Sequence, residues 1–256
     1  MQFIDTHTHI YDEAFAGEED AVILRAREAG VSVMLQPDVD SRERDAMFAL
    51  VDRHPGELYA MLGLYPGSVG KDWRDEIDAM LLYRDRKVVA LGEIGLDYHY
   101  GAEFAAEQRE AFRVQMELAA EMDLPVNIHL REATEDFFRI MDDCRGLHLR
   151  GSLHAFSGSY ETFRRVQKYG EWYVGIGGVV TFRKASLAET VMRIPLDRII
   201  LETDSPYLTP EPNRGTTNEP CHVPFVCMKV AEIKGITLEE AARITYDNGN
   251  RLYGLS

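Results

Sequence analysis

The chain has 256 residues, of which 45% are hydrophobic and 28% charged, and its formal net charge at pH 7 is −15. The length is close to the roughly 250 residues typical of a (β/α)8 barrel, so we expect one domain over residues 1–256. The acidic balance argues against a broad basic face for duplex DNA, and no apolar stretch is long enough to cross a membrane. With no secretory signal pattern at the start, a cytoplasmic protein is expected.

Short apolar runs rich in Val, Ile and Leu alternate with longer stretches of helical period along the chain. This alternation is typical of parallel strands buried by crossover helices. The predicted strands are Gln2–Thr6, Val31–Gln36, Tyr59–Leu64, Val88–Glu93, Val126–Leu130, Ser152–Phe156, Tyr173–Gly177 and Ile199–Thr203. The predicted fold is therefore an α/β protein, a (β/α)8 TIM barrel.

Helical spacing of apolar residues between these runs predicts helices that face the core. Two such faces are Met47, Leu50, Val51 and His54, and Phe104, Phe112, Met116, Ala119 and Met122. The segment Thr237-Leu-Glu-Glu240 has the form of a capping box, so a last helix is predicted to begin there.

A long segment after the last predicted strand, residues 205–220, is rich in proline and polar residues. Loops of this length are uncommon in compact domains and are usually either functional or disordered. Because prolines restrict the backbone, we interpret this segment as a rigid wall of a binding site.

Histidines and carboxylates fall where the predicted strands end. His7 and His9 are two residues apart, so both imidazoles point to the same side of the strand and can reach one metal ion. The other candidates are Glu93, His129, His154 and Asp204, at predicted strands four, five, six and eight. Each alone can be a helix cap or a buried packing residue. Six such groups on the rim where barrel enzymes carry their chemistry predict a divalent metal site, because unpaired buried carboxylates are costly.

Four imidazoles and two carboxylates suit two divalent cations that share one carboxylate, and Glu93 is the candidate bridge. Two such cations against Glu93 and Asp204 leave about +2 at the site, enough to attract an anionic substrate. Metal-activated water would attack this substrate, and Asp204 can accept the water's proton. Asp204 and Glu93 are thus the predicted catalytic residues. The ligand set does not separate Mg, Mn, Zn and Fe.

The other histidines are weaker candidates. His54 ends a predicted helix, where it offsets the helix dipole, and we interpret it as structural. His99 follows the strand-four rim in Leu96-Asp-Tyr-His99, where it can bind substrate or orient a ligand.

Several segments resemble the signature blocks of the TatD family of metal-dependent deoxyribonucleases. They are Phe3-Ile-Asp-Thr-His-Thr-His9, Gly92-Glu-Ile-Gly-Leu-Asp-Tyr-His99, Pro125-Val-Asn-Ile-His-Leu-Arg-Glu132, His154-Ala-Phe-Ser-Gly158, Leu201-Glu-Thr-Asp-Ser-Pro-Tyr-Leu208, Asn218-Glu-Pro220, and Asn248 with Arg251-Leu-Tyr-Gly254. The resemblance spans the chain and implies a metal-dependent hydrolase on an amidohydrolase-like barrel, with phosphodiester cleavage as the usual activity. The family's metal ligands fall on the same six residues.

The resemblance also implies a role for Arg131, which matches a family position. Its guanidinium could grip a phosphate through paired hydrogen bonds. The alternative is a salt bridge to Glu132 or Glu135 on the following helix.

One position departs from the family pattern. The family commonly has Gly-x-His-Pro after the third strand, and this chain has Gly63-Leu-Tyr-Pro66. Tyr65 cannot carry positive charge near pH 7, although its hydroxyl can donate a hydrogen bond to substrate phosphate. This departure leaves the metal ligands unchanged, but it bears on which bond the protein hydrolyses.

Three functions are therefore weighed. The leading one is a nuclease that acts on single-stranded DNA or DNA ends rather than on duplex DNA. The second is a hydrolase of another bond with the same site, such as the ester of a D-aminoacyl-tRNA or a small ester, amide, lactone or phosphoester. The third, a non-catalytic metal-binding protein, is disfavoured by the six intact ligands. The sequence does not set the oligomeric state.

Overall fold

The structure is a computed structural model that describes residues 1–183 and 186–255. Eight parallel strands form one sheet in the order β1 to β8. They are β1 (Phe3–Asp5), β2 (Val31–Gln36), β3 (Leu58–Leu62), β4 (Val88–Asp97), β5 (Val126–Arg131), β6 (Gly151–Leu153), β7 (Trp172–Ile176) and β8 (Ile199–Leu201). The predicted TIM barrel is confirmed.

Backbone hydrogen bonds between the first and last strands close the sheet into a barrel. The amide of Thr6 donates to the carbonyl of Leu201 at 3.0 Å, and the amide of Asp204 donates to the carbonyl of His7 at 2.9 Å. This seam continues past the strand ends, so it also fixes the two chain segments that carry candidate ligands.

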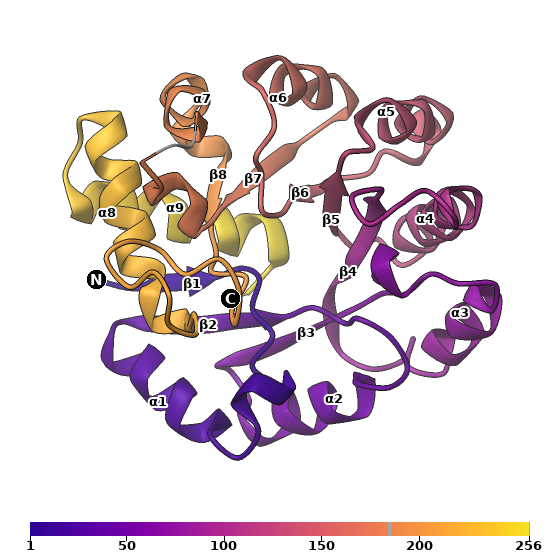
Figure 1. Ribbon diagram of the computed structural model, residues 1–256, viewed down its shortest axis with the longest axis horizontal. Helices are drawn as coiled ribbons and strands as arrows, with labels where there is room; N and C mark the ends of the chain where they lie inside the picture. Colours follow the sequence, from indigo (N-terminus) through magenta and orange to yellow (C-terminus); the bar gives the residue numbers. More distant parts are fainter. Residues whose placement is uncertain (184–185, 256) are drawn as a thin grey trace.

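Helices surround the strands on the outside of the barrel (Figure 1). They are α1 (Glu19–Glu28), α2 (Arg44–Arg53), α3 (Trp73–Leu81), α4 (Ala105–Glu121), α5 (Thr134–Asp143), α6 (Tyr160–Val166), α7 (Leu187–Arg193), α8 (Val223–Lys234) and α9 (Leu238–Tyr253). The predicted cap of α9 is present, because the Thr237 side chain accepts a hydrogen bond from the Glu240 amide. Within the described ranges, no helix has the length and apolar character needed to cross a membrane.

In most strands, alternate residues enter two separate apolar clusters. In β1, Phe3 belongs to the cluster beneath the helices, and Ile4 to the cluster inside the barrel. In β2, Met34 faces the helices and Leu35 faces inward. This division follows from the two-residue period of a strand. Because both faces of the sheet are buried, the strands are continuous apolar runs.

The last helix closes one end of the barrel interior. Leu252, Tyr253 and Leu255 join the inner cluster, and α9 packs against β1 and β8. The hydroxyl of Tyr253 lies 3.1 Å from Nδ2 of Asn127 and 2.9 Å from Oγ of Ser152. The opposite end, where the strands terminate, therefore remains open to the substrate.

Strand β4 continues beyond its predicted end at Glu93 and stops at Asp97. Its ladder to β5 is irregular between Leu91 and Ile94 and then resumes. Gly95 explains the difference, since a Cβ at this position would lie 2.0 Å from the carbonyl oxygen of His129. Glycine usually weakens a strand, but here it permits close approach to the neighbouring strand.

Candidate metal centre

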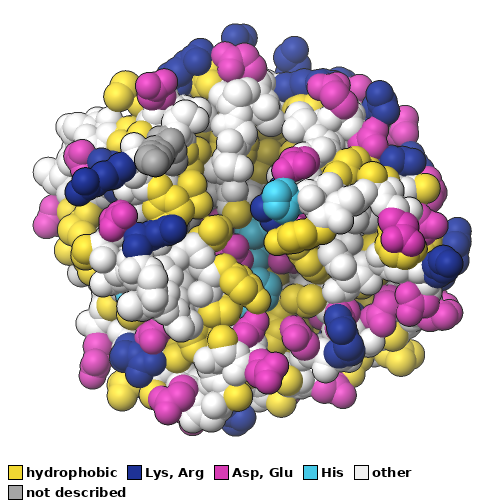
Figure 2. Space-filling model, viewed as in Figure 1, with side chains coloured by type: hydrophobic (Ala, Val, Ile, Leu, Met, Phe, Trp, Pro, Cys, Tyr) yellow, Lys and Arg dark blue, Asp and Glu magenta, His cyan; other side chains and the backbone are white. Residues whose placement is uncertain are grey.

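All six predicted ligands converge at the open end of the barrel. Figure 2 shows histidine side chains at the floor of a hollow near the middle of this face. His7 and His9 follow β1, Glu93 lies on β4, His129 on β5, His154 follows β6 and Asp204 follows β8. Most are buried, so they face one another rather than bulk solvent.

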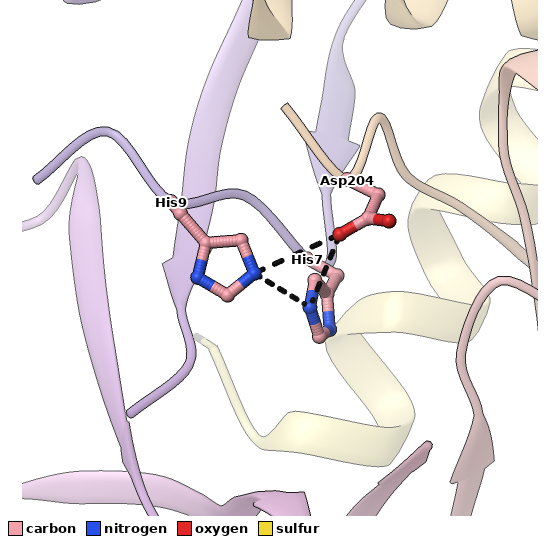
Figure 3. A group of neighbouring side chains, drawn as sticks. All are labelled: His7, His9 and Asp204. Atoms are coloured by element: carbon pink, nitrogen blue, oxygen red, sulfur yellow. Dashed lines mark hydrogen bonds and ion pairs between the residues drawn. The ribbon is translucent and has the colours of Figure 1, made fainter. Parts of the chain in front are cut away.

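The first half-site consists of His7, His9 and Asp204 (Figure 3). The Nε2 atoms of the two histidines are 3.2 Å apart. Oδ1 of Asp204 lies 3.6 Å from each of these nitrogens. Three potential ligand atoms thus surround a single position.

The second half-site consists of Glu93, His129 and His154. Oε1 of Glu93 lies 2.8 Å from Nδ1 of His129 and 2.8 Å from Nε2 of His154. These two nitrogens are 3.1 Å apart. The arrangement parallels the first half-site, with one carboxylate oxygen between two imidazoles.

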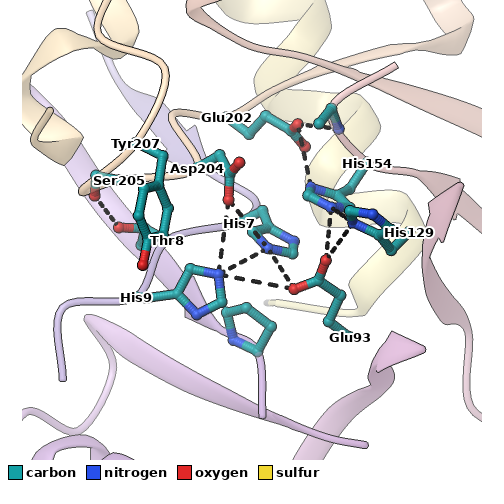
Figure 4. Close-up of polar contacts among 12 residues, drawn as sticks. His7, Thr8, His9, Glu93, His129, His154, Glu202, Asp204, Ser205 and Tyr207 are labelled. Carbon is teal, nitrogen blue, oxygen red and sulfur yellow. Dashed lines mark hydrogen bonds and ion pairs between the residues drawn. The ribbon is translucent and has the colours of Figure 1, made fainter. Parts of the chain in front are cut away.

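Glu93 lies between the half-sites (Figure 4). While its Oε1 faces His129 and His154, its Oε2 lies 3.4 Å from Nε2 of His7 and 3.8 Å from Nε2 of His9. The two oxygens of one carboxylate therefore face opposite ways, as a bridging ligand requires.

The donor set fits divalent cations. In each half-site, two imidazole nitrogens face each other at hydrogen-bond distance. A cation bound to both nitrogens would accept the lone pair of each one. Ligand atoms of His7, Glu93 and His154 also lie within 4.8 Å of one another. Nitrogen and carboxylate donors in this number suit Zn, Mn, Fe or Mg.

Both carboxylates are ionised at neutral pH. Burial by itself would raise the pKa of Glu93, but the neighbouring His154, His7 and His129 side chains hold that pKa well below its ordinary value. Burial likewise opposes ionisation of Asp204, while the neighbouring His9, His154 and His7 side chains lower its pKa. Both groups are therefore available as anionic ligands for a cation.

Neutral partners orient the histidines of the first half-site. Nδ1 of His7 donates to Oδ1 of Asn127 at 2.8 Å, and Nδ2 of Asn127 donates to Tyr253 and Ser152. Nδ1 of His9 lies 3.0 Å from the hydroxyl of Tyr11, which itself donates to the carbonyl of Pro37. In both rings Nε2 therefore faces the centre, and its lone pair is free to bind a cation.

Carboxylates stand behind the histidines of the second half-site. Nε2 of His129 donates to Oδ2 of Asp97 at 3.0 Å, and this bond helps to lower the pKa of Asp97 against the effect of burial. Nδ1 of His154 lies 3.7 Å from Oε1 of the buried Glu202. Gly175 leaves the space for Glu202, because a Cβ there would lie 2.0 Å from Oε2.

Sequence reasoning missed these orienting residues. Tyr11 lies two residues after His9, Asn127 two before His129, Asp97 four after Glu93, and Glu202 two before Asp204. The two-residue period that selected His7 and His9 is thus the signal that could have found them.

The predicted substrate residues differ in their placement. Tyr65 lines the cavity above the centre, donates to Oδ2 of Asp97 at 3.4 Å and packs edge-on against His129. Burial and the charges of Glu93 and Asp97 raise the pKa of Tyr65, so its hydroxyl stays protonated. Tyr65 is therefore a neutral hydrogen-bond donor near the second half-site.

Arg131 also lines the cleft, but the predicted alternative of a salt bridge is not found. Glu132 pairs with His99 and Glu135 with Arg165, and within the described ranges Arg131 has neither as a partner. The Arg131 guanidinium instead lies over the ring of Tyr100. His99 sits on the rim, bonded to Glu132, and is absent from the described lining of the cavities at the centre.

The loop of residues 205–220 forms part of the cleft wall, as predicted. Tyr207 and Leu208 line the cavity beside the candidate ligands His129, His154 and Asp204. Nδ2 of Asn218 donates to the carbonyls of Thr203 and Tyr207, at 2.9 and 2.6 Å. These bonds hold the loop against the strand that leads to Asp204.

Comparisons with known proteins agree over the length of the chain. The model of the family described as TatD related DNase matches residues 4–254. The metal-dependent hydrolase YabD of Bacillus subtilis (strain 168) is 38% identical over 255 residues, which cover 98% of this chain and 99% of that protein. The protein of Erwinia tasmaniensis named 3'-5' ssDNA/RNA exonuclease TatD is 35% identical over 259 residues, with coverage of 98% and 99%. Among solved structures, the TatD homologue YJJV of Escherichia coli K12 has a TM-score of 0.90 at 30% identity, over 98% of each chain.

Proposed function

The chain belongs to the family of TatD-related DNases, and from this membership we propose that it removes nucleotides from the ends of single-stranded nucleic acid. It is a metal-dependent hydrolase, and its relatives include proteins named as 3'-5' ssDNA/RNA exonucleases. The observation that carries the proposal is the position of Glu93, whose two oxygens face two half-sites at the floor of an open cleft.

We propose that the six residues hold two divalent cations, one in each half-site, with Glu93 shared. When bound, such cations supply an acidified water and stabilise negative charge on the attacked phosphate and the leaving oxygen. The ligands of the first would be His7, His9 and Asp204, and those of the second His129 and His154.

Asp204 is proposed to accept the proton of the attacking water. Its carboxylate is ionised, and its side chain is 16% exposed at the cleft, against 5% for Glu93. The bond from the Asp204 amide to His7 fixes the residue against the barrel seam. An ionised carboxylate that reaches the cleft can act as a general base.

Substrate phosphate is proposed to bind between Tyr65 and Arg131. Both line the same cavity beside His129. The Tyr65 hydroxyl can turn from its long 3.4 Å bond with Asp97 to donate to a phosphate oxygen. With a net charge of −15 and few cations at the cleft, a single strand or an end fits better than a duplex held along a basic face. A cytoplasmic location and the identity of the metals stay predictions.

The test is cleavage of end-labelled single-stranded DNA and RNA by purified protein with added manganese or magnesium. We expect stepwise shortening that stops with chelator and is lost in Asp204→Asn. Leu82→Ala is the matched control, since this exposed side chain is absent from the described cleft lining and should leave the rate unchanged. Intact oligonucleotides after prolonged incubation with metal-loaded protein would contradict the proposal.

A hydrolase of another bond is the second candidate, and Tyr65 is the observation that favours it. A neutral phenol in place of a histidine gives no positive charge to a phosphate. Clearance of a D-aminoacyl-tRNA ester or of a small ester, amide, lactone or phosphoester, with no shortening of oligonucleotides, would establish this candidate instead.

A further inference from the structure

The cleft over the metal centre has two ends of different chemistry. A cavity of about 250 Å³ includes Asp12 and Glu43 in addition to metal ligands. An adjoining cavity of about 500 Å³ contains Arg131 and the side chains of Tyr100 and Leu208. Both cavities share Tyr65 and three of the proposed ligands, His129, His154 and Asp204, so one molecule can span them.

Charge gives the cleft a direction. Among the described lining residues other than the proposed ligands, the charged ones at the smaller cavity are carboxylates and the one at the larger cavity is Arg131. A polyanion with its scissile phosphate at the centre is repelled by the first end and attracted by the second. Its body therefore leaves over Arg131.

Tyr100 stands on that exit path with its side chain in solvent. The residue is 87% exposed, and the side chains of Arg131 and His99 lie against its ring. Cζ of Arg131 lies 5.4 Å from the ring centroid, and the ring of His99 meets it edge-on at 4.8 Å. Nδ1 of His99 is in turn 2.6 Å from Oε1 of Glu132, which fixes the supporting imidazole.

The backbone before Tyr100 is bonded to β5, and a local turn encloses Tyr100. The Tyr98 amide donates to the carbonyl of Arg131 at 3.0 Å, and the Gly101 amide donates to the carbonyl of Tyr98 at 3.1 Å. The Tyr98 hydroxyl donates to Asp136 on α5 at 2.8 Å. The segment that carries Tyr100 is therefore attached to β5 at Arg131, and Tyr100 lines the same cavity as His129.

We propose that Tyr100, supported by Arg131, is a stacking platform for a nucleobase of the strand that remains bound after the terminal nucleotide is cleaved. This rests on the proposed nuclease function. An exposed aromatic ring beside a guanidinium offers a flat surface for a base and a cation for the adjoining phosphate. Because every base has a flat face, the platform favours nucleic acid substrates without selecting a sequence.

The test compares Tyr100→Ala with Tyr100→Trp, Tyr100→Phe and the control Leu82→Ala, whose side chain is 83% exposed. Affinity for a fluorescent oligothymidylate is measured by anisotropy, and KM and kcat by shortening of the same oligonucleotide. We expect Tyr100→Ala to raise Kd and KM by about fivefold to a hundredfold, with kcat nearly unchanged. The aromatic replacements should bind like the wild type.

A second arm removes the base instead of the ring. Oligonucleotides with a single abasic site, moved stepwise from the end, should show one position that weakens binding to the wild type but has no further effect in Tyr100→Ala. Unchanged Kd and KM in Tyr100→Ala, in a protein whose wild type shortens oligonucleotides, would overturn the platform and leave the nuclease standing. A wild type that neither binds nor shortens oligonucleotides would overturn both.

Discussion

The two half-sites present the same residue types to the centre and differ in what stands behind their histidines. Behind His7 and His9 are the neutral side chains of Asn127 and Tyr11. Behind His129 and His154 are carboxylates. A carboxylate partner raises the basicity of a ligating imidazole and strengthens its bond to a cation. The second half-site is therefore expected to hold its cation more tightly, and the first, with the more exposed Asp204, to exchange more readily.

The change with the largest expected effect is Glu93→Gln, which removes the charge that both half-sites share. Metal catalysis is worth several kcal/mol, so we expect cleavage to fall by at least about a thousandfold. Both cations should be lost, as measured by metal analysis of the folded variant. Retention of either cation at wild-type affinity would mean that Glu93 serves only one half-site.

Replacing the groups behind the histidines tests the difference itself. Asp97→Asn should weaken the tighter cation by about ten- to a hundredfold, since outer partners commonly have effects of that size. Asn127→Ala should act on the weaker cation instead. Calorimetric titration with manganese separates the two steps, and a thermal melt of each variant serves as the folding control. If both substitutions shift the same step, the half-sites are not distinct in the way inferred.

A smaller effect is expected at Tyr65, which touches the second half-site without belonging to it. Tyr65→His should raise the rate on single-stranded DNA by about three- to tenfold at pH 6 and by less at pH 8. Imidazole has an ordinary pKa near 6.5, so its positive charge is present at low pH and lost as pH rises, whereas the raised pKa of Tyr65 keeps that residue neutral throughout. The measurement is the cleavage rate of the wild type and of Tyr65→His at both pH values. Manganese affinity is the control and should be the same in both proteins. Equal gains at the two pH values would contradict this explanation.

Much of the fold could be predicted from sequence because strands buried on both faces are continuous apolar runs. The predicted range Val31–Gln36 matches β2. Prediction failed at β4, where Gly95 reads locally as a strand end and its role depends on the distance to β5. No local pattern encodes that distance.

The candidate ligands could be predicted for a related reason. Strand ends of a barrel meet on one rim, so position along the chain is sufficient to bring His7 and Asp204 together. The two-residue period could have found the residues behind the histidines, but which ligand each one orients depends on side-chain directions across elements, as does the support of Tyr100. Arg131 could pair with Glu132 by sequence distance, yet Glu132 bonds to His99 and leaves the guanidinium over Tyr100.

The hydrogen bond between Tyr253 and Asn127 has a consequence for how the protein matures during synthesis. His7 leaves the ribosome early, but Asn127, which orients it, is held in turn by a residue at the end of α9. A nascent chain that lacks α9 also lacks the Tyr253 hydroxyl that bonds to Asn127, so we expect it to hold His7 less firmly. We therefore expect full hydrolase activity only after translation through Tyr253.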